Sequence, residues 1–229
     1  MKNKLLNILK SIGIIILMLL FTSIFFVIFN LNPNNLTDKE YVIYVFISNI
    51  ILLGIYILIY RKTLISDLKN YINNFKSNIK TSLKYWAIGF GIMVISNLII
   101  TFILRKGLAG NEQDVRNYID AFPLYMLFST VIYAPVTEEL TFRKSIKDAV
   151  SNKWIYIITS GLIFGMLHIM SYITNWTDLV YLIPYSSLGI AFALLYHKTN
   201  NIFCPITMHA MHNLLAVITY LLGASLWKN

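Results

Sequence analysis

Seven apolar runs, each near the length that crosses a lipid bilayer, constrain this chain more than any other feature. About 20 apolar residues in a helix span the hydrocarbon core, and a helix satisfies its own backbone hydrogen bonds where no water is available. The sequence therefore predicts an all-α, polytopic transmembrane helix bundle of about seven spans, or eight if one run is split. The runs cover about residues 12–31, 41–60, 85–104, 122–142, 154–170, 179–196 and 202–222.

The order of polar residues predicts one domain with two parts. No linker rich in Pro, Gly or Ser and no internal repeat divides the 229 residues, so we expect a single membrane-embedded domain over residues 1–229. The first run is too long for a signal-peptide core and is predicted to be a retained span. Every ionisable residue at membrane depth follows Pro135. We therefore predict scaffold spans over about 1–121 and a functional core over about 122–222.

The basic residues predict the orientation of the chain. A formal charge of +9 suggests a nucleic-acid partner, but the basic residues alternate between loops and form no patch, so we expect none. Of the 19 Lys and Arg, 14 fall in one set of loops, and the positive-inside rule makes that set, with the N-terminus, cytoplasmic in a multi-pass protein of the cell membrane. The other set holds five: Lys39, Arg105, Lys106, Arg116 and Lys228.

Two adjacent carboxylates, Glu138 and Glu139, lie near the end of the fourth run. A charge at mid-bilayer costs roughly 2.5 to 3.5 kcal/mol, so each needs a partner or a function. Adjacent residues point about 100° apart on a helix, and only Glu139 is at the i, i+4 spacing from Arg143. The pattern predicts that Glu139 pairs with Arg143 and that Glu138 remains available.

A short calculation predicts that His168 lies level with Glu138. If the fourth helix ends near residue 150 and turns back through residues 151–153, positions 138 and 168 are equally far from the turn. At a 1.5 Å rise per residue, both lie about 22 Å from it. Gly161 and Gly165 are expected to let these two helices approach closely.

The last run carries His209 and Asn213 on one face at i, i+4 spacing. Counted from the start of the run, His209 is expected a turn or two shallower than His168 unless the helix is tilted, and Asn213 matches better in depth. His212 lies nearby on almost the same face. The only cysteine, Cys204, is interpreted as a small buried residue.

These residue types suit hydrolysis of a peptide bond. A carboxylate held near imidazoles in a dry cavity can act as a general base towards water, and an amide or imidazole can donate hydrogen bonds to an oxyanion. The same types can also form a zinc site from Glu138, His168 and His209, although the metalloprotease pattern HExxH is absent.

Three motifs in order resemble the CPBP family of intramembrane endopeptidases, which contains CAAX proteases and bacteriocin-processing enzymes and is also called Abi. The EExxxR motif corresponds to Glu138 through Arg143, FxxxH to Phe164 through His168, and HxxxN to His209 through Asn213. Each motif alone is weak, but three at compatible spacing within apolar runs are a specific pattern.

The resemblance implies a helical membrane protease that acts on a peptide or membrane-protein substrate. Members of the family are often described as metalloproteases, and we prefer a glutamate mechanism without a cofactor. It implies that Glu138 is the base, that His168 helps to hold the water, and that His209 and Asn213 stabilise the oxyanion. Glu139 is a fifth catalytic candidate, through either a direct role or its ion pair with Arg143, and Arg143 and Phe164 would support the site. The zinc metalloprotease remains the alternative mechanism.

Two other classes of protein compete with a protease. One is a proton-coupled transporter, in which these residues form a proton relay, and the other is a non-catalytic membrane interaction or immunity protein. A transporter would favour repeated halves, whereas the polar residues here are confined to the second half of the chain. The substrate, the oligomeric state and the role, in peptide maturation, signalling or bacteriocin-type self-immunity, stay open.

Overall fold

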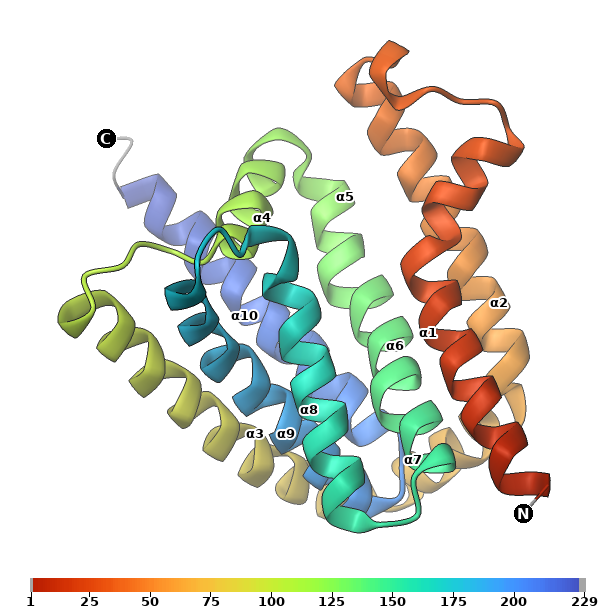
Figure 1. Cartoon of the computed structure of the whole chain (residues 1–229). Helices are drawn as coiled ribbons and strands as arrows, with labels where there is room; N and C mark the ends of the chain where they lie inside the picture. Colours follow the sequence, from red (N-terminus) through yellow and green to blue (C-terminus); the bar gives the residue numbers. More distant parts are fainter. Residues whose placement is uncertain (1, 227–229) are drawn as a thin grey trace.

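The structure, a computed structural model, describes residues 2–226, and in this part of the chain it is a bundle of helices without strands (Figure 1). By length and composition, six stretches can cross a membrane. They are centred on α1 (Lys2–Ile28), α2 (Asp38–Asn73), α3 (Phe75–Leu98), α8 (Lys153–Ile169), α9 (Leu182–Thr199) and α10 (Phe203–Leu226). The short elements between them are η1 (Pro33–Asn35), η2 (Ile99–Ile103), α4 (Gly110–Ala121), η5 (Met170–Tyr172) and η6 (Trp176–Tyr181).

The fourth apolar run forms a further helical column, made of short segments that follow one another without a break. Every junction residue in it has right-handed helical backbone angles, and two of its segments, η3 and η4, have π-helical hydrogen bonding. The predicted all-α polytopic bundle is confirmed, with this run divided into segments too short to count among the six. The column consists of α5 (Pro123–Phe128), η3 (Ser129–Tyr133), α6 (Ala134–Glu138), η4 (Glu139–Ser145) and α7 (Ile146–Ala149).

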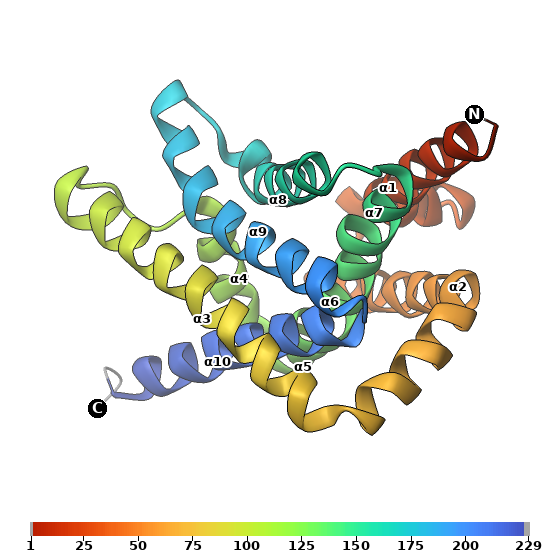
Figure 2. The same cartoon turned by 90° about the horizontal axis from the view of Figure 1, so that it is seen from below.

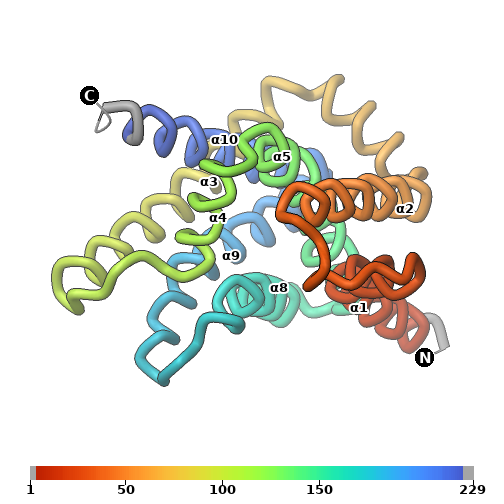
Figure 3. Tube along the Cα trace, turned by 90° about the horizontal axis from the view of Figure 1, so that it is seen from above, coloured from red at the N-terminus to blue at the C-terminus, as the bar shows by residue number. Residues whose placement is uncertain are grey.

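The column lies in the middle of the bundle. Views from below and above place it between α1 and α2 on one side and α8, α9 and α10 on the other (Figures 2 and 3). The chain reverses after α7, as predicted, because Asn152 caps the start of α8 by accepting hydrogen bonds from the backbone N–H groups of Trp154 and Ile155. The turn brings α8 back along η4.

The two glycines of α8 pack differently from the prediction. A Cβ at Gly161 would lie 2.4 Å from Cγ1 of Ile190, and one at Gly165 would lie 2.2 Å from Oγ of Ser186. Both neighbours belong to α9, so the expectation that these glycines face the glutamate helix is wrong. The face of α8 towards the column contacts the side chain of Arg143, which is large. The face with the two glycines contacts α9, where small residues allow close approach.

Replacing Gly161 with Ala should therefore destabilise the protein by about 1–3 kcal/mol, because the new methyl group overlaps side-chain and backbone atoms of Ile190. Thermal unfolding in detergent measures the loss. Gly54→Ala is the matched control, since Gly54 lies in α2 with nothing within 4 Å of its added Cβ. Equal unfolding temperatures for the two variants would contradict the close packing of α8 on α9.

Segments predicted to be cytoplasmic lie together at one end of the bundle, where the N-terminus and the turn before α8 are found (Figure 1). Nδ2 of Asn7 donates to the backbone oxygen of Asp148 (3.1 Å). Nδ2 of Asn201, just after α9, donates to the backbone oxygen of Asp67 in α2 (2.7 Å). Of the residues predicted on the opposite side, Lys228 lies outside the described residues.

We expect this end to face the cytoplasm, and cysteine labelling checks the orientation. In a Cys204→Ser background, a cysteine at Asn152 should react with an impermeant reagent only after the cells are opened. A cysteine at Asn111, in α4 at the other end, should react in intact cells and serves as the positive control. Labelling of the Asn152 position in intact cells would reverse the predicted orientation. The assignment of a scaffold to about 1–121 and a functional core to about 122–222 stays a prediction.

Candidate active site

The predicted pair of Glu139 and Arg143 forms the buried centre of the site. Nε of Arg143 lies 2.8 Å from Oε2 of Glu139, and Nη2 donates to Oε1 at 3.2 Å. Both side chains have 0% exposed surface. A buried ion pair is tolerated only when its geometry is good and its remaining hydrogen-bonding groups are satisfied. The two-pronged contact links Glu139, at the start of η4, to Arg143 one turn later.

Ser160, in α8, completes the environment of the arginine and was missed in the sequence analysis. Nη1 of Arg143 donates to Oγ of Ser160 at 3.1 Å, and that hydroxyl donates to the backbone oxygen of Phe142 at 2.8 Å. The guanidinium group also lies 4.7 Å from the centre of the Phe164 ring. The spacing of Ser160, four residues before Phe164 and eight before His168, is the signal that could have identified it.

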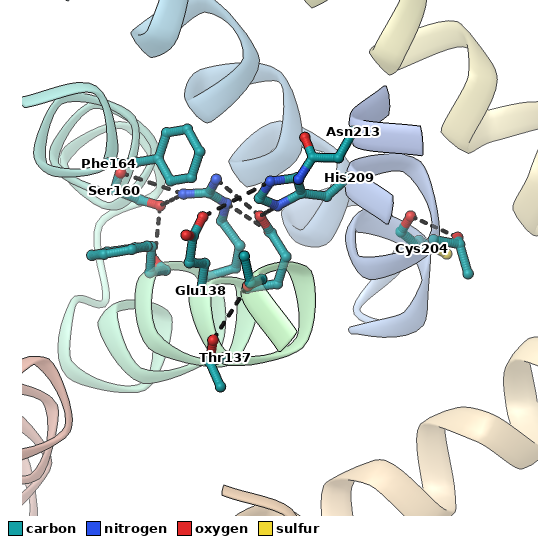
Figure 4. Close-up of polar contacts among 12 residues, drawn as sticks. Thr137, Glu138, Ser160, Phe164, Cys204, His209 and Asn213 are labelled. Carbon is teal, nitrogen blue, oxygen red and sulfur yellow. Dashed lines mark hydrogen bonds and ion pairs between the residues drawn. The ribbon is translucent and has the colours of Figure 1, made fainter. Parts of the chain in front are cut away.

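His209 contacts both glutamates through different ring nitrogens, and Figure 4 shows it facing Glu138. Its Nδ1 is 2.9 Å from Oε1 of Glu139, and its Nε2 is 3.8 Å from Oε2 of Glu138. An ionised carboxylate only accepts hydrogen bonds, so Nδ1 carries a proton in this contact. Aromatic rings of Phe164 and Phe192 lie 5.8 and 5.5 Å from the imidazole ring. These contacts hold the ring in one orientation.

The shallower depth of His209 was expected only for an upright helix, and α10 is tilted. Figure 1 shows α10 crossing the bundle obliquely, so a count of residues from the start of the run does not measure depth along the bundle. The tilt brings His209 directly to both glutamates.

Glu138 has the free carboxylate predicted from its position. Its Oε2 is buried and has no hydrogen-bond partner within the described residues, and its side chain is 20% exposed. Thr137, the preceding residue, points away from the site in Figure 4 and donates to the backbone oxygen of Tyr133. Glu138 therefore presents an oxygen that can accept a proton, whereas Glu139 is held by Arg143 and His209.

His168 lies at the edge of the site. Its Nδ1 is 2.8 Å from the backbone oxygen of Phe164, and its ring lies 4.4 Å from the Phe164 ring and 5.0 Å from that of Tyr185. A carbonyl oxygen only accepts, so Nδ1 is the donor in this contact. Phe164 thus separates His168 from His209 while contacting both.

Asn213 lies one turn beyond His209 on α10, beside it in Figure 4. Its Nδ2 donates to the backbone oxygen of Thr130 in η3, at 2.7 Å. His212 faces elsewhere, with its ring 5.8 Å from that of Phe90. The structure therefore brings Glu138, Glu139 and His209 into contact and places the other candidates around them.

The zinc alternative needs Glu138, His168 and His209 around one point. Among residues 2–226 no group of three or more His, Cys, Asp or Glu side chains is arranged to hold a metal ion. Nδ1 of His209 already contacts the carboxylate of Glu139. The three proposed ligands do not fit a metal site in this arrangement, so we derive no step through zinc.

Comparison with known proteins finds a family match and several relatives. Residues 120–215 match the family described as "Type II CAAX prenyl endopeptidase Rce1-like". "Putative membrane peptidase YdiL" of Bacillus subtilis (strain 168) is 31% identical over 154 residues, which are 66% of this chain and 53% of that protein. An "Uncharacterized protein" of Mycoplasma capricolum subsp. capricolum is 33% identical, over 68% of this chain and 51% of that protein.

A third relative is more distant but of similar length. "UPF0177 protein YbdI" of Lactococcus lactis subsp. lactis is 24% identical over 65% of this chain and 83% of its own length. The chain spans about half the length of the first two relatives, and no solved structure matches it. The resemblance predicted from the three motifs is confirmed: residues 120–215 of this multi-pass membrane protein match the Rce1-like family.

Proposed function

We propose that this protein is an intramembrane endopeptidase that hydrolyses a peptide bond of a membrane peptide or protein with water activated by Glu138. One observation carries the proposal. Of the two adjacent carboxylates, Glu139 contacts Arg143 and His209 through Oε1 and lies 2.8 Å from Nε of Arg143 through Oε2, whereas Oε2 of Glu138 has no hydrogen-bond partner among the described residues and faces Nε2 of His209 at 3.8 Å. A water oxygen about 2.8 Å from each of these two atoms would fit that separation.

The reaction then divides among the residues by their hydrogen-bonding roles. Glu138 accepts a proton from the water while the water oxygen attacks the carbonyl carbon of the substrate. Glu138 later returns that proton to the leaving nitrogen. The oxyanion needs donors. A His209 that carries both ring protons would donate from Nε2, and its charge would balance the second carboxylate beside the single Arg143. The second N–H of the Asn213 amide is a further donor.

Phe164 and Arg143 support the reaction indirectly. The Phe164 ring contacts the guanidinium group of Arg143 and both imidazoles, and so excludes water from the space between them. A dry site strengthens each electrostatic contact within it. With Nδ1 donating to the Phe164 carbonyl, a neutral His168 would use Nε2 to accept a hydrogen bond from the water or the substrate at the edge of this space.

The substrate can be identified by comparing membrane peptides. Cells that express the wild-type protein should contain peptide termini that are missing from cells expressing Glu138→Gln at the same level. Cleavage sites should lie within or beside apolar segments, since the glutamates lie on a helix of the apolar bundle. Identical membrane peptides in the two strains, with both proteins inserted, would count against a protease.

Removal of metal ions separates the glutamate and zinc mechanisms. A carboxylate next to a polarising histidine can activate water unaided, whereas a zinc-bound water requires the ion. We expect the purified protein, stripped with a strong chelator and checked by elemental analysis, to keep its rate of hydrolysis of the identified peptide within about twofold. Loss of activity that returns with one equivalent of zinc would make Glu138, His168 and His209 metal ligands.

A further inference from the structure

Pro135 lies inside the helical column, where proline is unusual. It is the second residue of α6, it is buried, and it directly follows the π-helical segment η3. Proline has no backbone N–H, so within a helix it leaves the carbonyl group one turn earlier without a donor. A buried carbonyl group in this position requires another partner.

The hydrogen bonding of η3 identifies that carbonyl. The N–H of Ala134 donates to the oxygen of Ser129, five residues earlier. In the same register, position 135 would donate to the oxygen of Thr130, but proline cannot. The side chain of Asn213, on α10, makes this hydrogen bond instead, at 2.7 Å. The Asn213 amide therefore supplies to the Thr130 oxygen the donor that Pro135 lacks.

We propose that Pro135 is a positioning residue that fixes Asn213. By removing the helix's own donor, it turns the Thr130 carbonyl into an acceptor that holds the Asn213 amide beside His209. The contact also joins α10 to the glutamate-bearing column one turn from the contact between His209 and Glu139. The consequence for catalysis rests on the proposed function, whereas the hydrogen bond itself does not.

A double-mutant cycle of Pro135→Ala and Asn213→Ala tests this role by unfolding. In the native background, Asn213→Ala leaves the Thr130 oxygen unpaired and should lower the unfolding temperature by about 2–8 °C. In the Pro135→Ala background the new backbone N–H of residue 135 can donate to the Thr130 oxygen. Asn213→Ala should then lower the unfolding temperature by less than about half of its loss in the native background. Equal losses in both backgrounds would overturn the proposal.

Pro184→Ala is the matched control. Pro184 is a buried proline in the first turn of α9, on another helix than Thr130, so its replacement gives the Thr130 carbonyl no new donor. The unfolding losses of Pro184→Ala and Asn213→Ala should be additive. Coupling of Asn213 to both prolines alike would mean that the effect is not specific to position 135 and would contradict the proposal.

Kinetics with the identified peptide provide the second measurement. Asn213→Ala should lower kcat by about 10²–10³-fold if the amide stabilises the oxyanion. Pro135→Ala should also lower kcat with KM unchanged, and the double variant should be no slower than Asn213→Ala alone. A Pro135→Ala protein with wild-type kcat would overturn the positioning role. If the wild-type protein hydrolyses nothing, the proposed function fails, and the unfolding cycle still decides whether Pro135 fixes Asn213.

Discussion

Replacing Glu138 with Gln is expected to lower kcat by about 10²–10⁴-fold, because the amide keeps the size of the side chain but cannot accept the proton of the water. Stability should change little, since Oε2 of Glu138 makes no hydrogen bond that the amide would lose. The measurements are single-turnover hydrolysis of the identified peptide and thermal unfolding in the same detergent. The two together distinguish loss of the base from loss of the fold.

Glu139→Gln provides the contrast, and Glu112→Gln the control. Glu139 contacts Arg143 and His209 in the fully buried centre, so its substitution should lower stability as well as activity. Glu112 lies on α4 in an ion pair with Arg116, and its side chain is 40% exposed. Its substitution should change neither quantity measurably. Full turnover by Glu138→Gln would remove Glu138 as the base.

The second large effect is expected for Arg143→Met, which should lower the free energy of unfolding by about 3–5 kcal/mol, because it leaves the carboxylate of Glu139 buried without its cation. Ser160 would also lose the partner that its hydroxyl accepts from. Chemical or thermal unfolding of the protein in detergent measures the change.

Arg116→Met is the matched control, because it removes an arginine at the same 2.8 Å distance and i, i+4 spacing from an exposed glutamate. Its expected effect is about 0–1 kcal/mol. In the Arg143→Met background, Glu139→Gln should recover part of the lost stability, since the unpaired charge is then removed. If Arg143→Met were no less stable than Arg116→Met, the buried pair would not be what holds η4 in place.

The fold class follows from residues alone because the bilayer leaves few choices. Seven apolar runs separated by basic or polar loops can form all their backbone hydrogen bonds in a bilayer only as helices. All seven runs are helical in the structure. The ion pair of Glu139 with Arg143 was also predictable, since it depends on spacing within one helix. The turn at residues 150–152 was predictable from the end of one apolar run and the start of the next.

Contacts between helices far apart in the sequence could not be predicted in the same way. Ser160 was missed because its partner, Arg143, is identified only when the rotation of α8 about its axis is known. Gly161 and Gly165 were assigned to the wrong neighbouring helix for the same reason. A face of small residues predicts close packing but does not indicate which helix packs there. The depth of His209 depended on the tilt of α10, which packing against neighbouring helices sets.

The sequence by itself determined that this is a membrane bundle, that its ionisable residues gather in the second half, and which seven side chains to consider. Spacing and hydropathy are local properties, and a bilayer turns them directly into helices. Only the tertiary structure decided which of those side chains contact one another. It alone shows that Glu139 is held by Arg143 and His209 while Glu138 is free, and that Asn213 is held by Thr130, because these contacts depend on the relative tilt and rotation of packed helices.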